Sequence, residues 1–209
     1  MMSNTLTIQG RVTRLPLSRA SSQALAHIER YDWILFTSKH AVVFFAKDMR
    51  RRRLSLSQKS HVAAVGPETA AVLRAEGFPV HIVPKRFTAR DMVNDIPNVK
   101  GLRILFPRSA IAPPDAIRIL RKRGARVTVV PLYITTVRPL SRAEKRALLA
   151  GSYTRLIFRS PSGVRGLMRQ LQSKKKHVVR TISVQCIGPT TKRAAREAGF
   201  KHITITGAR

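Results

Sequence analysis

The chain has 209 residues, of which 44% are hydrophobic, so it can bury a substantial core and is not generally disordered. Forty Lys and Arg against ten Asp and Glu give a formal net charge of +30. Such a field attracts polyanions of every kind, including nucleic acid, anionic membranes and polycarboxylates, and does not choose among them. The basic runs, such as residues 50–53 and 174–176, are interpreted either as solvated faces or as sites for a specific anion.

Cysteine content and hydropathy limit the possible location of the protein. The lone Cys186 excludes a disulfide framework and a cysteine metal cluster, and its apolar surroundings indicate a buried thiol rather than a nucleophile. No run approaches membrane-spanning length, and residues 1–10 contain no apolar signal region. We therefore expect a cytoplasmic protein without a membrane segment.

A duplication organises the chain. Residues 31–83 recur as residues 153–205 at a constant offset of 122, with eleven identities in 53 ungapped positions. These identities fall mostly at Gly, Pro, Ser, Thr and apolar positions, which decide backbone geometry and packing. The period is too long for a solenoid and predicts two similar domains.

Each copy is predicted to form a strand, a helix, a second strand and a second helix. Trp33–Phe36 is a short apolar run typical of a strand buried on both faces, and Ser38 follows it as a candidate helix N-cap. Residues 61–65 predict the next strand, Gly66 with Pro67 the turn into the next helix, and Gly77 its end. The equivalent signals in the second copy are Ser160-Pro161, Gly188-Pro189 and Gly199. This alternation predicts parallel sheets.

The fold class expected is α/β, with two similar parallel-sheet domains of flavodoxin-like, doubly wound type joined by a two-stranded β connector. Residues 1–16 and 131–139 are predicted to be the connector strands, residues 17–130 the central domain, and residues 140–209 a second, partial domain. Residues 5–15 alternate weakly between apolar and polar side chains, as a solvated extended segment does. Ser141 and Glu144 form a candidate capping box at the start of the second domain. The second copy has no counterpart of residues 102–130, so its sheet is expected to have few strands.

The usual catalytic signatures are missing. The sequence contains no Gly-rich phosphate loop, no metal-spaced His or Cys set and no GxSxG motif. Several helix N-termini instead follow strand ends, where free N–H groups and the helix dipole favour anions. The alternative is that these residues are only helix caps. The candidate anion-binding residues at these termini are Thr37, Ser38, Gly66, Thr69, Ser160, Ser162, Gly188, Thr190 and Thr191.

Six segments in order resemble one family. They are Asp32–Ser38 with Ala41-Val42, Val65–Ala70, Phe106–Arg108, Tyr133–Thr135, Phe158–Val164 and Cys186–Thr191. Together they resemble uroporphyrinogen-III synthase over residues 31–200. Members of that family usually begin with a further strand and helix and end with a further helix, so this chain is expected to be truncated at both ends. Arg159 stands where many relatives have Thr.

The resemblance implies a reaction without cofactor or metal, in the cleft between two domains. The linear tetrapyrrole hydroxymethylbilane loses its terminal hydroxyl, the last ring inverts through a spiro intermediate, and the macrocycle closes. The resemblance also implies that Arg108 joins the residues that bind this polycarboxylate and that Tyr133 faces the cleft. Because hydroxide is a poor leaving group, the Tyr133 phenol is the predicted general acid. The alternative is a strand tyrosine that packs against the other connector strand.

The alternative function is that of a non-catalytic basic protein on a degenerate synthase scaffold that binds nucleic acid. Only 6% of the residues are aromatic, and base stacking by a single-strand binder needs exposed aromatic side chains. Nucleic acid is therefore expected only as a non-specific electrostatic partner, and the protein is expected to be a monomer.

Overall fold

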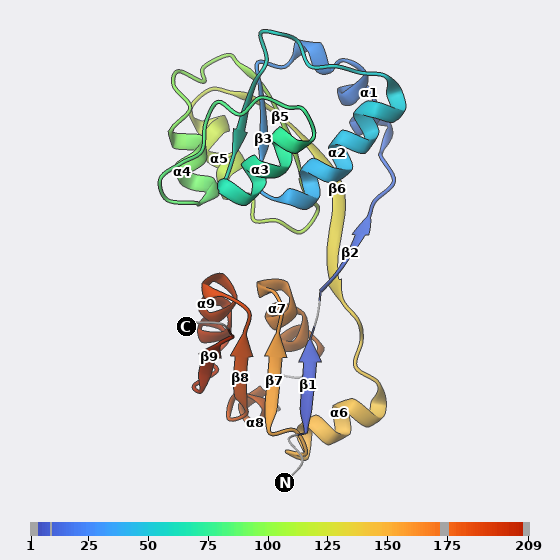
Figure 1. The fold of residues 1–209 in the computed structure, drawn as a ribbon, viewed down its shortest axis with the longest axis vertical. Helices are drawn as coiled ribbons and strands as arrows, with labels where there is room; N and C mark the ends of the chain where they lie inside the picture. The colour runs from blue at the N-terminus through green and yellow to red at the C-terminus, as the bar shows by residue number, and fades with distance from the viewer. Residues whose placement is uncertain (1–3, 9, 172–175, 207–209) are drawn as a thin grey trace. The chain divides into compact units, whose positions relative to one another are not determined.

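The computed structural model describes residues 4–8, 10–171 and 176–206, and the chain forms two compact units. The first comprises Arg14–Ile134, and the second comprises the described residues up to Thr13 and from Thr135 onward. Each contains a sheet, built mainly of parallel strands, with helices packed against it (Figure 1). The predicted α/β class is confirmed.

A five-stranded sheet with the order β2-β6-β5-β3-β4 lies mainly in the first unit, although four residues of β2 and the last three of β6 fall within the second. Its strands are β2 (Gly10–Arg14), β3 (Trp33–Phe36), β4 (His61–Ala64), β5 (Arg103–Ser109) and β6 (Arg126–Val137). Its helices are α1 (Arg19–Ala26), the 3-10 turn Ile28–Arg30, α2 (Lys39–Arg52), α3 (Pro67–Ala75), α4 (Ala89–Asn94) and α5 (Asp115–Lys122). Strand β3 is buried along its whole length and pairs in parallel with β4 and β5, as its continuous apolar sequence predicts.

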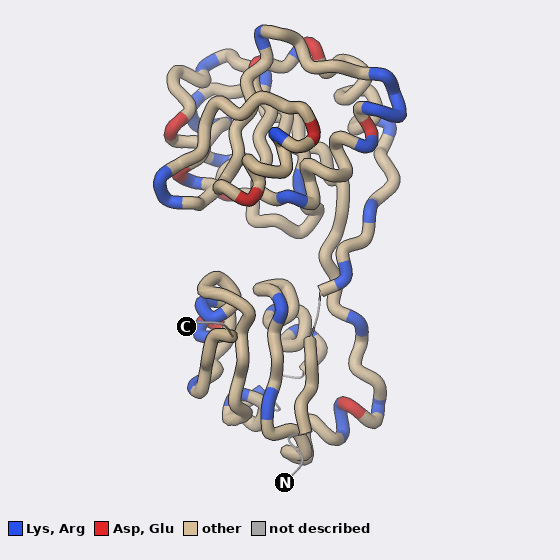
Figure 2. The backbone as a smooth tube through the Cα atoms, viewed as in Figure 1, with Lys and Arg blue, Asp and Glu red and all other residues tan. Residues whose placement is uncertain are grey.

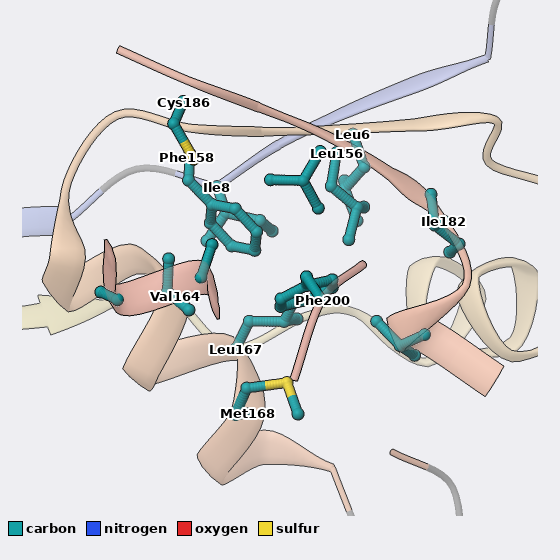
Figure 3. Packing of buried hydrophobic residues seen from close by; sticks show 14 of the residues in the cluster. Leu6, Ile8, Leu156, Phe158, Val164, Leu167, Met168, Ile182, Cys186 and Phe200 are labelled. Atoms are coloured by element: carbon teal, nitrogen blue, oxygen red, sulfur yellow. The ribbon is translucent and has the colours of Figure 1, made fainter. Parts of the chain in front are cut away.

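The second unit is built on a four-stranded sheet with the order β1-β7-β8-β9, in which all pairs are parallel. Its strands are β1 (Thr5–Ile8), β7 (Arg155–Phe158), β8 (Ser183–Cys186) and β9 (Ile203–Ile205). Its helices are α6 (Arg142–Leu149), α7 (Pro161–Gln170), α8 (Lys176–Arg180) and α9 (Pro189–Glu197). Figure 3 shows Leu6 and Ile8 of β1 packed with Leu156 and Phe158 of β7 in its core.

Two of the expected connector boundaries are corrected. Residues 5–15 do not form one connector strand, because β1 pairs with β7 and buries Leu6 and Ile8 in the second unit. The weak alternation therefore reports a sheet-edge strand with one buried face. Only β2 lies beside β6, and β6 itself is continuous from Arg126, so residues 131–139 do not form a separate segment. The second sheet is thus one strand larger than residues 140–209 alone would make it.

The duplication is visible in the backbone of both units. Gly66 and Gly188 are the N-caps of α3 and α9, each followed by Pro at the first helical position. Gly77 and Gly199 follow these helices with φ of 81° and 91°, the left-handed conformation that favours glycine. In the second unit β1 occupies the place beside β7 that β5 occupies beside β3.

Candidate active site

The hydroxyl of Ser38 organises the carboxyl edge of the first sheet. Ser38 follows β3 and caps α2, and its Oγ accepts a hydrogen bond from the backbone N–H of Ala41 at 3.2 Å. The first turn of α2 contains no acidic residue, so the positive end of the helix dipole is not neutralised there. Thr37 is half-buried beside this turn. The arrangement is chemically suited to an anionic or proton-accepting ligand.

The phenol of Tyr133 joins this helix terminus. Its hydroxyl lies 2.7 Å from Ser38 Oγ, and its side chain is buried, with 6% of the residue exposed. The ring lies beside the rings of His40 and Phe44 on α2, at centroid distances of 5.8 and 5.9 Å. Both ring neighbours come from the helix that Ser38 caps.

A bulge precedes the tyrosine. The parallel register of β5 and β6 shifts between Arg108 and Ser109, so that Arg108 pairs with Pro131 and Ser109 pairs with Tyr133. Pro131 has no N–H to donate to a ladder, and bulges change the direction of nearby side chains. The irregular stretch thus lies at the residue that reaches Ser38.

Burial keeps this phenol protonated. Desolvation raises the pKa of Tyr133 above its ordinary value, and this outweighs the hydrogen bond from Ser38 and the nearby charge of Arg108, which lower it. Partial desolvation of the otherwise exposed His40, together with the positive charge of the neighbouring Lys39, lowers the pKa of its imidazole. At neutral pH the site therefore presents a neutral phenol beside a neutral imidazole.

Arg108 is a buried cation near the phenol. It is 4% exposed, its guanidinium donates to the Pro113 carbonyl at 2.7 Å, and its Cζ lies 5.2 Å from the centroid of the Phe106 ring. Desolvation lowers the pKa of Arg108, and Tyr133 acts on it electrostatically in the opposite direction. Across the described part of the chain, no carboxylate forms an ion pair with Arg108. The positive charge of Arg108 can therefore stabilise a negative charge on the phenol oxygen of Tyr133.

The second unit repeats the helix terminus without the phenol. Ser160 caps α7 by accepting from the Gly163 N–H at 3.2 Å, and its Oγ lies 2.8 Å from the hydroxyl of Ser162. A Cβ on Gly10 would lie 2.9 Å from Ser162 Oγ, so glycine permits this close approach. The first turns of α7 and α9 contain no acidic residue.

The sequence-predicted residues fall into two sets. Thr37, Ser38, Gly66, Thr69, Arg108 and Tyr133 belong to the first unit, and Ser160, Ser162, Gly188, Thr190 and Thr191 belong to the second. The structure joins Ser38 with Tyr133, and Ser160 with Ser162. Thr69 and Thr191 are 5% and 2% exposed, so their hydroxyls are largely covered, whereas Thr190 is exposed.

Sequence reasoning missed His40 and Phe44 as neighbours of Tyr133. Both lie in the first two turns of α2, on the helix that Ser38 caps, so their position after the cap was the available signal. Within residues 4–8, 10–171 and 176–206, no group of three or more His, Cys, Asp or Glu could hold a metal ion. No helix of this described part is long and apolar enough to cross a membrane. Cys186 is free and buried, and burial raises the pKa of its thiol.

The two parallel-sheet units, with helix N-termini at their strand ends, define the class of two-domain α/β proteins whose ligand sites lie at sheet carboxyl edges. The family model of uroporphyrinogen-III synthase HemD matches residues 7–206, and the chain belongs to this family. In an alignment of 209 positions it is 32% identical to "Uroporphyrinogen-III synthase" of Synechococcus elongatus, and the alignment covers 92% of this chain and 75% of the relative.

Two further comparisons bear on length and fold. The chain is 27% identical to "Porphyrin biosynthesis protein HemD" of Ruminiclostridium josui, of which the match covers 38%. The crystal structure of a mutant uroporphyrinogen III synthase from Thermus thermophilus superimposes with a TM-score of 0.79 at 23% identity, covering 96% of this chain and 82% of that one. That likeness supports the same fold.

Proposed function

We propose that this chain is an active uroporphyrinogen-III synthase, a cyclising hydro-lyase that converts hydroxymethylbilane to uroporphyrinogen III and water by inverting the last pyrrole ring. The observation that carries this proposal is the hydrogen-bonded pair of Tyr133 and Ser38 at the N-terminus of α2, in a chain that belongs to this family. The pair offers a proton donor where an anionic substrate would be bound.

The chemistry begins with departure of the terminal hydroxyl, which needs a proton. Ser38 Oγ already accepts from the Ala41 N–H, and one of the two protons of Ser38 and Tyr133 lies between their oxygens. The other proton remains for an external acceptor, whichever hydroxyl carries it. As this proton leaves, the positive charge of Arg108 stabilises the negative charge that develops on the phenol oxygen. The departing oxygen then leaves as water.

The carboxylates of the substrate are proposed to bind at the helix N-termini. Free N–H groups at the starts of α2 and α9, which carry no acidic residue in their first turns, support this assignment. The residues assigned to binding are Thr37, Ser38, Gly66, Thr69, Arg108, Ser160, Ser162, Gly188, Thr190 and Thr191. Thr190 is exposed and therefore better placed for direct contact than Thr69 or Thr191, which are buried.

The proposed partners follow from the same features. We expect a monomer in the cytoplasm, and the free, buried Cys186 is compatible with a reducing compartment. Nucleic acid is expected to associate only through the net charge of +30, with an affinity that falls steeply with salt. Size-exclusion chromatography with light scattering tests the monomeric state.

A product-isomer experiment tests the activity. The purified chain is incubated with hydroxymethylbilane, and the isomers are separated by chromatography. The expected result is mainly the type III isomer, formed faster than the bilane closes unaided to the unrotated isomer. Formation of only the unrotated isomer, at the rate seen without protein, would overturn the proposal.

A further inference from the structure

A cavity lies at the opposite end of α2 from Ser38. It has a volume of about 400 Å³ and is lined by Arg14, Ser22, Arg51, Arg52 and the Leu15–Leu17 segment. Helix α2 runs from Lys39 to Arg52, so at 1.5 Å per residue the two helix ends are roughly 20 Å apart. This cavity is therefore separate from the Tyr133 site, and the proposed cyclisation does not use it.

Three guanidinium groups line the cavity against one carboxylate. Asp48 is fully buried, and its Oδ1 accepts hydrogen bonds from Arg14 and, at 3.0 Å, from Arg51. The local charge of these four side chains is consequently +2. The buried carboxylate of Asp48 therefore fixes the positions of two of the three arginine side chains, Arg14 and Arg51.

Arg52 has unused hydrogen-bonding capacity. Its Nη2 donates to Ser22 Oγ at 2.8 Å, which anchors the guanidinium to α1. Its Nε is buried and, with Asp48 Oδ2, finds no hydrogen-bond partner in the described part of the chain. A buried donor without a partner is costly, and each such atom calls for an explanation. Arg52 lines the cavity although its Nε is covered, so a bound anion would stabilise this guanidinium through its positive charge.

We propose that this cavity binds a compact polyvalent oxyanion of the phosphate class, such as a pyrophosphate or a phosphate ester. Guanidinium forks match phosphate oxygens, and groups that come from the β2–α1 segment and from the end of α2 suit a tetrahedral ligand better than a planar carboxylate. The volume falls in the range of small-molecule sites. Figure 2 shows the basic segment at this end of α2.

The general field of the protein must be separated from a built site. A net charge of +30 attracts any polyanion, but that attraction is screened by salt and is insensitive to which single arginine is removed. The variant Arg52→Gln removes a cavity charge and leaves both partners of Asp48 in place. Its matched control is Arg53→Gln, which removes an exposed charge one residue further on, outside the cavity lining.

Titration calorimetry with pyrophosphate at about 0.15 M salt tests the proposal. We expect saturable binding to the parent, a loss of about tenfold or more in affinity for Arg52→Gln, and less than a twofold change for Arg53→Gln. If Arg52→Gln does not fold, Ser22→Ala keeps the charge, releases the anchor and is expected to weaken binding by about threefold. Citrate and inorganic phosphate are titrated in parallel.

Each outcome decides the matter. Binding that is equally reduced in Arg52→Gln and Arg53→Gln would assign the effect to the general field and overturn the site. Citrate binding as tight as pyrophosphate would overturn the phosphate class. If the parent shows no saturable heat at millimolar pyrophosphate, both the site and its preference for phosphate are overturned. These variants do not alter the Tyr133 site, so the test of pyrophosphate binding is independent of the test of synthase activity.

Discussion

In both copies of the duplicated unit, the equivalent residue of a helix packs against β6. The first copy has an aromatic residue at this position, and the second copy has a glycine. In the first copy this position is Phe44, whose ring lies 5.9 Å from that of Tyr133. In the second copy it is Gly166, where an added Cβ would lie 2.7 Å from Val137 Cβ. One helix thus packs an aromatic ring against a phenol, and the other brings its backbone directly against an aliphatic residue.

The caps of these helices show what the difference means for chemistry. Ser38 and Ser160 accept the same hydrogen bond from the N–H three residues on, at 3.2 Å in both cases. The hydroxyl of Ser38 is shared with a phenol, whereas that of Ser160 is shared with Ser162. Both copies keep the capped helix terminus, and in the first copy the cap hydroxyl is hydrogen-bonded to a phenol, which is a weak acid.

The first turns of the second helices differ in charge. The first turn of α3 contains Glu68, which pairs with Lys39 at 3.3 Å, whereas the equivalent position in α9 is Thr190. A carboxylate already stabilises the dipole of α3, so a substrate carboxylate at Gly66 and Thr69 is expected to be held less strongly than one at the terminus of α9. The terminus of α9 remains open to an anion. The copies are therefore proposed to divide proton donation and anion binding between them.

Removing the hydroxyl of Tyr133 is expected to have the largest effect, which is on turnover. Tyr133→Phe keeps the ring beside Phe44 and is expected to lower turnover by roughly 10²-fold, or about 2.7 kcal/mol of barrier, with the melting curve almost unchanged. The unrotated isomer should increase in proportion. Tyr31→Phe, a half-buried tyrosine of the same unit, is the matched control. A Tyr133→Phe variant that makes mainly the type III isomer at the parent rate would show that the hydroxyl is not the acid.

Filling the glycine of the second copy tests the packing half of the comparison. Gly166→Ala places a methyl against Val137, whose stiff β-branched side chain cannot move aside easily, so we expect a loss of about 1–3 kcal/mol in the free energy of unfolding. Thermal and denaturant unfolding measure it. Adding Val137→Ala should recover part of the loss through a favourable coupling between the two sites. Equal melting of Gly166→Ala and the parent would mean that the helix can shift at no cost.

Exchanging the first-turn residues tests the charge half. Thr190→Glu brings to α9 the acid that α3 already has, and it should raise KM about fivefold through repulsion of roughly 1 kcal/mol while stabilising the free helix slightly. Thr190→Gln is the neutral control of similar size. If both variants have the same KM, the N-terminus of α9 does not receive a substrate carboxylate.

Local backbone rules made the helix ends predictable. The caps at Ser38 and Ser160, the Gly-Pro turns and the left-handed Gly77 and Gly199 depend on a few adjacent residues, and all occur as expected. The placement of β1 was not predictable in this way, because Leu6 and Ile8 specify a buried face but not the sheet that supplies it.

The candidate site followed a similar division. Ser38 was found from its capping position, but Tyr133 lies 95 residues away and entered through the family resemblance alone. Nothing local predicts that α2 carries His40 and Phe44 against that ring. The cavity at Arg52 could not be predicted either. Residues 50–53 are four consecutive arginines, and only the fold determines which guanidinium nitrogen among them is buried.

The smallest effect concerns the anchor of the second unit, where the predicted capping box of Ser141 and Glu144 is confirmed. Hydrogen bonding to Arg138, together with the Ser141 N–H, lowers the pKa of Glu144 to about 2. Because the folded-state pKa is depressed, this stabilisation is fully present above the unfolded pKa of about 4.5 and is lost as the pH falls through about 2. Glu144→Gln retains an acceptor for the cap but loses the ion pair, so we expect a melting temperature lower by about 2 °C or less at pH 7. The difference from the parent should shrink steadily between pH 5 and pH 3, and Arg138→Gln should behave in the same way. A difference that stays constant over that range would assign the effect of Glu144 to side-chain packing. The Ser141 hydroxyl would then be the only part of the capping box that stabilises the start of α6.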